Sequence, residues 1–216
     1  MIARPSAEDP GFPAIAFESA TRRKTITKHR PAIAEGWFNM TELLTVAPPR
    51  AAGPAAAAPQ DFTEFMSGFP SGVAIVTTRS PEHGPQGLTC SSLISVTLTP
   101  PTLLVSIKSH SPVLAAIRHR GHFAVNLLRD GRERSARVFS SPVADRFGEV
   151  AWRDSPALGL PWLTDDAFAM AECTLADTHE VGDHVLVLGR VANLEQSGRT
   201  SPLLYGLRTF AAWAPR

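Results

Sequence analysis

The sequence predicts an all-β protein, an antiparallel β-barrel of Greek-key type with few short helices. Six or seven segments show the two-residue alternation or the β-branched content that is typical of strands. Only two or three short helical segments accompany them, without regular alternation, which disfavours a doubly wound parallel sheet. The 216 residues are 44% hydrophobic, enough for one substantial core.

The first elements follow the change in composition at residue 61. Residues 61–67 are expected to form a short helix with aromatic and methionine side chains on one face. Residues 73–78 are rich in β-branched side chains and predict a strand. Residues 80–87 contain prolines and glycines and predict a turn.

The stretch from 87 to 111 organises the chain. Residues 87–92 are dense in small polar side chains where a core strand would be apolar. Residues 95–99 alternate as a half-buried strand does. Pro100-Pro101 should interrupt the ladder, because neither residue has an N–H to donate. A further strand is expected over 103–108, with apolar side chains at the odd positions.

A helix is expected over 111–120. Ser111 is a favourable N-cap, Pro112 suits the first helical position, and Gly121 can end the helix. Residues 142–161 lack a regular pattern and are expected to form a lid or a partner-facing loop. The other expected elements are a helix at 130–139, strands at 123–127, 168–177 and 184–194, and a closing segment at 203–213.

Residues 1–60 differ from the domain expected at 61–216. Residues 51–59 consist only of Ala, Pro and Gly, which cannot bury enough apolar surface to offset the entropy of ordering. We therefore expect a disordered Ala/Pro-rich N-terminal extension without a signal-peptide pattern. Met40 is a plausible start of the native protein, which leaves the presence of residues 1–39 open.

Composition disfavours several classes of partner. The net charge of +1 argues against nucleic acid and anionic membranes, and the basic run at 21–28 is best explained as solvated charge. No apolar run has the length of a membrane span. Cys90 and Cys173 lack CxxC or metal-ligand spacing, so we expect reduced, structural thiols in a cytoplasmic protein. The histidines likewise lack metal spacing, and no metal site is expected.

Lys108, Ser109 and Ser111 converge where a strand ends and a helix begins. An ammonium, hydroxyls and the free amides of a helix N-terminus together suit an anion, most simply a phosphate. The same residues also fit an ordinary helix cap beside a surface lysine, and the residues alone leave both interpretations open.

These motifs resemble the flavin-reductase-like, FMN-binding split-barrel family, the reductase components of two-component flavin-dependent monooxygenases. The resemblance extends from about Phe62 to Trp213. It is carried by an ordered set of short motifs, none specific alone: Phe69-Pro-Ser-Gly-Val73, Gly87-Leu-Thr-Cys-Ser-Ser92, the Pro-Pro turn within 95–102, the Ser-rich corner at 108–111, Phe123-Ala-Val-Asn-Leu127, Gly182-Asp-His184 and Pro202-Leu-Leu-Tyr205.

The resemblance implies a split barrel and a homodimer with flavin near the subunit interface. It implies that His184 is the catalytic residue beside the nicotinamide. As His184 is far in sequence from the phosphate residues, we expect it not to share their task. The implied flavin-binding residues are Ser71, Thr89, Cys90, Ser91, Ser92, Lys108, Ser109, Ser111 and Tyr205.

Each of these residues also has a simpler explanation. The run Thr89–Ser92 could be a solvated edge strand, and its Cys90 side chain is expected to face the core. His184 could be a surface turn residue, and Tyr205 a buried residue of the last strand.

The function that the resemblance implies is an NAD(P)H-dependent flavin reductase. It would reduce FMN or FAD by hydride transfer from NADH or NADPH to flavin N5, and supply the reduced flavin to a separate monooxygenase. The alternative is a non-catalytic flavin-binding carrier or sensor. An oxidase of the pyridoxamine-phosphate type is a third possibility, but it requires basic contacts for a second phosphate that the sequence does not place.

Overall fold

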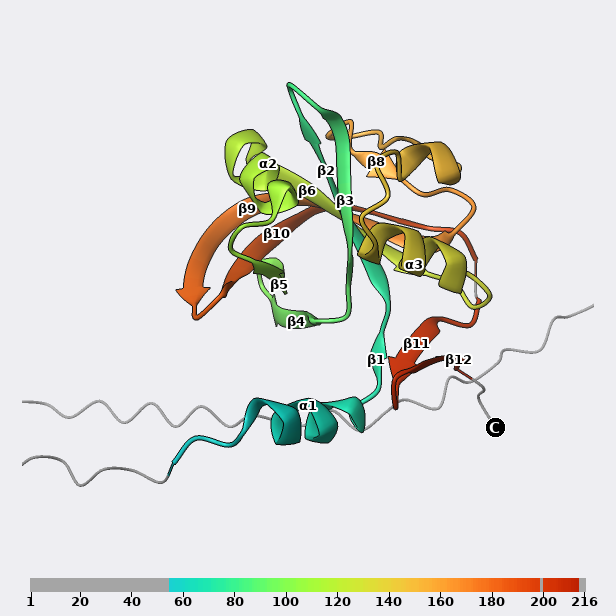
Figure 1. Ribbon diagram of the computed structural model, residues 1–216. Helices are drawn as coiled ribbons and strands as arrows, with labels where there is room; N and C mark the ends of the chain where they lie inside the picture. The colour runs from blue at the N-terminus through green and yellow to red at the C-terminus, as the bar shows by residue number, and fades with distance from the viewer. Residues whose placement is uncertain (1–54, 199, 214–216) are drawn as a thin grey trace, which may run out of the picture. The chain divides into compact units, whose positions relative to one another are not determined.

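The computed structural model describes residues 55–198 and 200–213, which are built mainly of strands (Figure 1). The helices are α1 (Pro59–Ser67), α2 (Pro112–Arg120), α3 (Glu133–Ser140) and the 3-10 helix η1 (Phe147–Glu149). The strands are β1 (Ser71–Gly72), β2 (Ala74–Ser80), β3 (Gly84–Cys90), β4 (Leu93–Leu98), β5 (Pro101–Lys108), β6 (His122–Leu128), β7 (Arg153–Asp154), β8 (Pro161–Trp162), β9 (Ala167–Val181), β10 (His184–Gln196), β11 (Leu203–Gly206) and β12 (Thr209–Ala212).

The main sheet has seven strands in the order β3-β2-β6-β9-β10-β5-β4, and neighbouring strands are antiparallel. Strands β5 and β6 are consecutive in the chain but are separated in the sheet by β9 and β10, an ordering typical of Greek-key barrels. The two edge strands, β3 and β4, are joined by only two residues and do not form a ladder with each other. The predicted all-β antiparallel fold is confirmed, as an open, split barrel.

The core confirms the alternation predicted for β5. Its odd-numbered residues Leu103, Val105 and Ile107 are buried, and the residues between them are only half-buried. Helix α2 covers this core, and its Val113, Leu114 and Ile117 pack in the same buried cluster as β5. The helix ends at Gly121 in the left-handed conformation, with φ 73°. Figure 1 shows α2 and α3 on either side of β3.

Residues 84–87 were expected in a turn but form the first half of β3. The strand lies at an edge of the sheet, where Pro85 can be accommodated because one side of the strand has no ladder partner. Helix α3 begins at Glu133 rather than at residue 130, because Asp130 and Gly131 form a turn with a positive φ at the glycine.

The expectation of a lid over 142–161 is wrong for its second half. The Glu172 carboxylate accepts hydrogen bonds from Ser155 Oγ and from the Leu158 amide, at 2.7 Å for the amide. Leu160 is fully buried, and the amide of Leu163 donates to the buried Asn126 side chain at 3.0 Å. These contacts fix the segment to the sheet, so it cannot swing as a lid without breaking a buried polar network.

Helix α1 confirms the predicted helix at 61–67, although none of its residues is buried. It contacts the β11–β12 turn through a hydrogen bond from Leu207 N to Ser67 O at 2.6 Å and an ion pair of Arg208 with Glu64 at 2.8 Å. Most of the predicted N-terminal extension, including the basic run at 21–28, lies outside the described residues.

Both cysteines are free and buried, as expected. Within residues 55–198 and 200–213, no group of three or more His, Cys, Asp or Glu side chains is placed to hold a metal ion. None of the helices in this part of the chain is long and apolar enough to cross a membrane.

Candidate functional site

The end of β5 and the start of α2 form a polar turn, residues 108–111, which we call the phosphate corner. The Ser109 amide donates to the Asp183 carbonyl, and the Ser111 amide donates to the Lys108 carbonyl, both at 3.0 Å. Ser111 is the N-cap residue, as predicted, but its hydroxyl makes no capping hydrogen bond. That hydroxyl, the first amides of α2 and the exposed Lys108 ammonium are therefore available to an anion.

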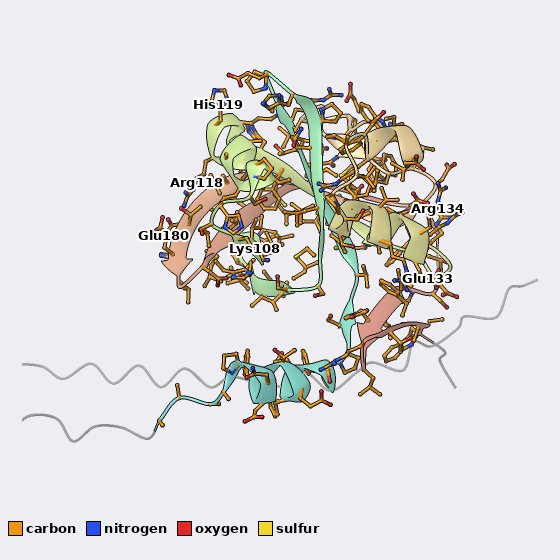
Figure 2. The ribbon with its side chains drawn as sticks, viewed as in Figure 1. Lys108, Arg118, His119, Glu133, Arg134 and Glu180 are labelled. Atoms are coloured by element: carbon orange, nitrogen blue, oxygen red, sulfur yellow. The ribbon has the colours of Figure 1, made fainter. Side chains whose placement is uncertain are left out.

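A hollow of about 440 Å³, the corner hollow, opens beside this turn. Ser111 lines it, but Ser109 does not. The lining contains no acidic residue and four basic ones, Lys108, His110, Arg146 and His184. Figure 2 places Lys108 on the same side of the molecule as Arg118 and Glu180, which pair at 3.5 Å and connect α2 to β9. The hollow therefore has the charge and the donors that a phosphate requires.

The sequence separation of His184 from the phosphate corner was misleading. In the ladder between β10 and β5, His184 lies directly opposite Lys108, and it lines the corner hollow. Its Nδ1 donates to Asp183 Oδ1 at 2.8 Å, and this hydrogen bond, together with the charge of His184, lowers the pKa of Asp183. Asp183 thus orients the imidazole and leaves Nε2 to face a ligand. His184 therefore lies at the phosphate corner and not apart from it.

The polar run Thr89–Ser92, at the end of β3 and directly after it, contains both hydrogen-bonded and free side chains. Thr89 Oγ1 donates to the Ala136 carbonyl at 2.6 Å, and Ser92 Oγ donates to the Ser106 carbonyl at 3.1 Å. Cys90 is buried in the core, so only its backbone can contact a ligand. In the described part of the chain, the Ser91 hydroxyl makes no hydrogen bond and is exposed. Ser91 is therefore the side chain of this run that is free to bind a polar ring edge.

A larger cleft, of about 880 Å³, shares its floor with this run. Ser91, Ser92 and His184 lie on that floor, and α1 and β11 form the walls. Ser71 and Tyr205, which are partners in the β1–β11 ladder, both line the cleft. Tyr205 is half exposed and packs at 5.1 Å from the Phe210 ring, so it is not the buried core residue of the simpler explanation.

Arg146 was not predicted from the sequence. Its Nη1 donates to the Gly87 carbonyl at 2.9 Å, and its Nε and Nη2 donate to the Ser141 carbonyl at 3.2 and 2.7 Å. These bonds hold the guanidinium against β3 at the rim of the corner hollow. Arg146 lies in a segment without periodicity, so only its three-dimensional neighbours identify it.

A split antiparallel barrel that places a phosphate corner beside a cleft with aromatic walls defines a flavin-binding protein of the split-barrel class. The residues present fit a flavin, because the Lys108 ammonium, the Ser111 hydroxyl that makes no capping hydrogen bond and the free Ser91 hydroxyl lie along one connected surface. The chain belongs to the flavin reductase-like domain family, whose sequence profile matches residues 66–214.

Known proteins of this family resemble most of the chain. A flavin reductase (NADPH) from Lentzea aerocolonigenes is 49% identical over 155 residues, 72% of this chain and 90% of that protein. The reductase subunit HsaB of a flavin-dependent monooxygenase from Rhodococcus jostii is 35% identical over 147 residues, 68% of this chain and 74% of that protein. The Streptomyces globisporus NADH:FAD oxidoreductase SgcE6, solved with NAD and FAD fragments, superposes with a TM-score of 0.68 at 29% identity, covering 74% and 98% of the two chains.

Proposed function

We propose that this chain is an NAD(P)H-dependent flavin reductase that transfers a hydride from NADH or NADPH to FMN or FAD. The observation that carries the proposal is the junction at His184, which lines both the corner hollow and the larger cleft. One residue thus borders the place for a phosphate and the place for two stacked rings.

The chain's own residues act mainly by positioning. Lys108 and the Ser111 hydroxyl hold the flavin phosphate, and Ser91 binds the polar edge of the isoalloxazine. His184, oriented by Asp183, binds the nicotinamide nucleotide through Nε2. A flavin held there would supply N5 as the acceptor of the hydride and its two electrons, and this transfer would need close stacking of the two rings rather than a protein acid. The walls of α1 and Tyr205 reduce the access of water to the stacked rings.

The test is NADH and NADPH oxidation, followed at 340 nm, with and without added flavin. We expect oxidation that depends on flavin and saturates with it. Flavin binding without flavin-dependent oxidation of either nucleotide would instead establish the carrier or sensor alternative.

We propose that the reduced flavin leaves the cleft for a separate monooxygenase, as the naming of HsaB indicates for that relative. Support comes from the exposed floor of the site, where Ser91 and Ser92 are open to solvent. A dialysis assay under anaerobic conditions tests whether reduced flavin leaves the protein. Reduced flavin should appear in a chamber that a dialysis membrane separates from the enzyme.

We further propose a homodimer that covers strand β4. This edge strand contains no charged residue, and it exposes Ile94, Val96 and Leu98, whereas unpartnered edges commonly contain charge. An apolar hollow lined by β4, β6, β9 and β10 adjoins it. A second copy of this chain, related by a two-fold axis, presents the same apolar surface and can therefore cover this patch.

Light scattering tests the dimer. The wild type should have twice the mass of the 23.2 kDa chain, and Leu98→Glu should shift it to the monomer. Leu207→Glu is the matched control, because Leu207 is similarly exposed but lies outside β4. A monomeric wild type would contradict the proposal.

The two free thiols also support a cytoplasmic location, where cysteines remain reduced. Fractionation of the native host would test it, with recovery in the cytoplasmic fraction as the expected result.

A further inference from the structure

Arg146 lies between two hollows. It lines the corner hollow, and it also lines a smaller one of about 200 Å³ between the start of β3 and residues 143–147. The second hollow is mainly polar, and the two share Arg146 on their adjoining rims. A ligand with a phosphate at residues 108–111 could therefore continue past the guanidinium into the smaller hollow.

The guanidinium retains unpaired charge. Among the described residues, its hydrogen bonds go only to the neutral carbonyls of Gly87 and Ser141, and no carboxylate lies within 4.0 Å of it. Three of its five N–H groups are used, which leaves two for an anion. Together with Lys108, the corner hollow has two permanent cations and no acidic lining, which suits a phosphate dianion or a pyrophosphate.

The smaller hollow has the chemistry of a nucleobase site. His83 provides an exposed imidazole ring, and Gln86 an amide whose Nε2 makes only a long 3.4 Å hydrogen bond. Val143 and Ala144 add an exposed apolar surface. Asp145 also borders it, but its Oδ1 accepts from the Gly148 amide at 2.9 Å. Both hollows lie along the edge strand β3, and its backbone from Gln86 to Thr89 extends roughly 10 Å, the length of a ribose and a pyrophosphate.

We propose that Arg146 and the smaller hollow form a subsite for the adenosine diphosphate half of a dinucleotide. The proposal rests on the proposed function, since it takes the phosphate corner as one end of the ligand. Two sources share this chemistry, FAD as the flavin and NAD(P)H as the donor. Arg146 binds the pyrophosphate, and His83 and Gln86 contact the adenine.

The test uses Ala144→Glu, which introduces a carboxylate into the smaller hollow, and Ala144→Gln as a neutral control of the same size. Ala144 is exposed, so both variants should fold, and thermal unfolding checks this. Binding of ADP, FAD, FMN and riboflavin is measured by calorimetry and flavin fluorescence on the full chain. We expect Ala144→Glu to weaken ADP binding at least tenfold and Ala144→Gln less than threefold, with FMN and riboflavin unchanged within twofold.

The dinucleotides distinguish the two sources. If the subsite holds FAD, the Kd for FAD rises with that for ADP, and the KM for NADH with riboflavin as acceptor is unchanged. If it holds the hydride donor, that KM rises and the Kd for FAD is unchanged. Either result supports the subsite. It is overturned if ADP does not bind the wild type, or if Ala144→Glu and Ala144→Gln affect ADP equally.

Failure of the proposed function would look different. Suppose that the wild type binds ADP and that Ala144→Glu weakens this binding, but that the wild type oxidises neither NADH nor NADPH with any flavin. That result would support the subsite and refute the reductase function. A wild type that reduces riboflavin but does not bind ADP would retain the reductase and refute the subsite.

Discussion

Lys108→Ala tests the phosphate corner most directly. The side chain is exposed, and its ammonium has no carboxylate partner within 4.0 Å among the described residues, so its charge is available to a ligand. A hydrogen bond to a charged group contributes about 1.5–3 kcal/mol. Because solvent screens an exposed lysine, we expect a loss of about 1–2 kcal/mol, or roughly a 5- to 30-fold increase in the Kd for FMN.

The assay is fluorescence titration of FMN and of riboflavin, which has no phosphate. Riboflavin affinity should change less than twofold in Lys108→Ala, and Lys108→Arg, which retains the charge, should recover most of the FMN affinity. The FMN effect should decrease at about 1 M salt, where the Debye length is about 3 Å. Equal losses for FMN and riboflavin would refute the assignment of Lys108 to the phosphate.

Three further changes test other parts of the structure. His184→Ala should raise the KM for NADH and lower kcat in stopped-flow reduction. Because His184 lies opposite Lys108, a several-fold loss of FMN affinity is also expected. Unchanged values for NADH and FMN would mean that His184 is an ordinary surface residue. Burial alone would raise the pKa of Glu172, but hydrogen bonds from Ser155, Asn193 and two backbone amides outweigh burial and lower the pKa. The contribution of Glu172 to the stability of the folded state is therefore present above about pH 4.5 and is lost as the pH falls below that. Glu172→Gln should destabilise the protein by about 1–3 kcal/mol at pH 7 and flatten the acid decline seen in urea unfolding by up to about 1.4 kcal/mol per pH unit; an unchanged decline would exclude Glu172 as its source. Deletion of residues 1–58, which end just before α1, should leave folding and NADH oxidation intact, and a loss of either would show that the extension is required.

Local patterns predicted much of the fold. The alternation in β5, the N-cap position of Ser111 and the left-handed Gly121 each depend on a few neighbouring residues, and each is present as expected. The pairing of His184 with Lys108 depends on strand register between segments 76 positions apart in the sequence, which no local pattern encodes.

Contacts between distant segments also explain why the packing of residues 142–161 and the position of Arg146 were not predicted. Residues 142–161 have no periodicity, yet their second half is fixed by Glu172 and Asn126, which come from other strands. Arg146 has no neighbouring motif, and its importance depends on the Gly87 carbonyl 59 positions away. A hydrophobic pattern specifies which face a residue occupies, whereas buried polar partners are specified only by the completed fold.

The buried thiols have a consequence for durability. Reduced flavin that meets oxygen before it reaches an acceptor produces hydrogen peroxide, which attacks cysteine as the thiolate. Burial raises the pKa of Cys90, and burial together with the charge of Glu172 raises the pKa of Cys173 to about 12. Both therefore remain protonated and shielded, although Cys90 is directly beside Ser91, which is exposed and lines the larger cleft. The two thiols are thus protected from the peroxide that reduced flavin produces in air.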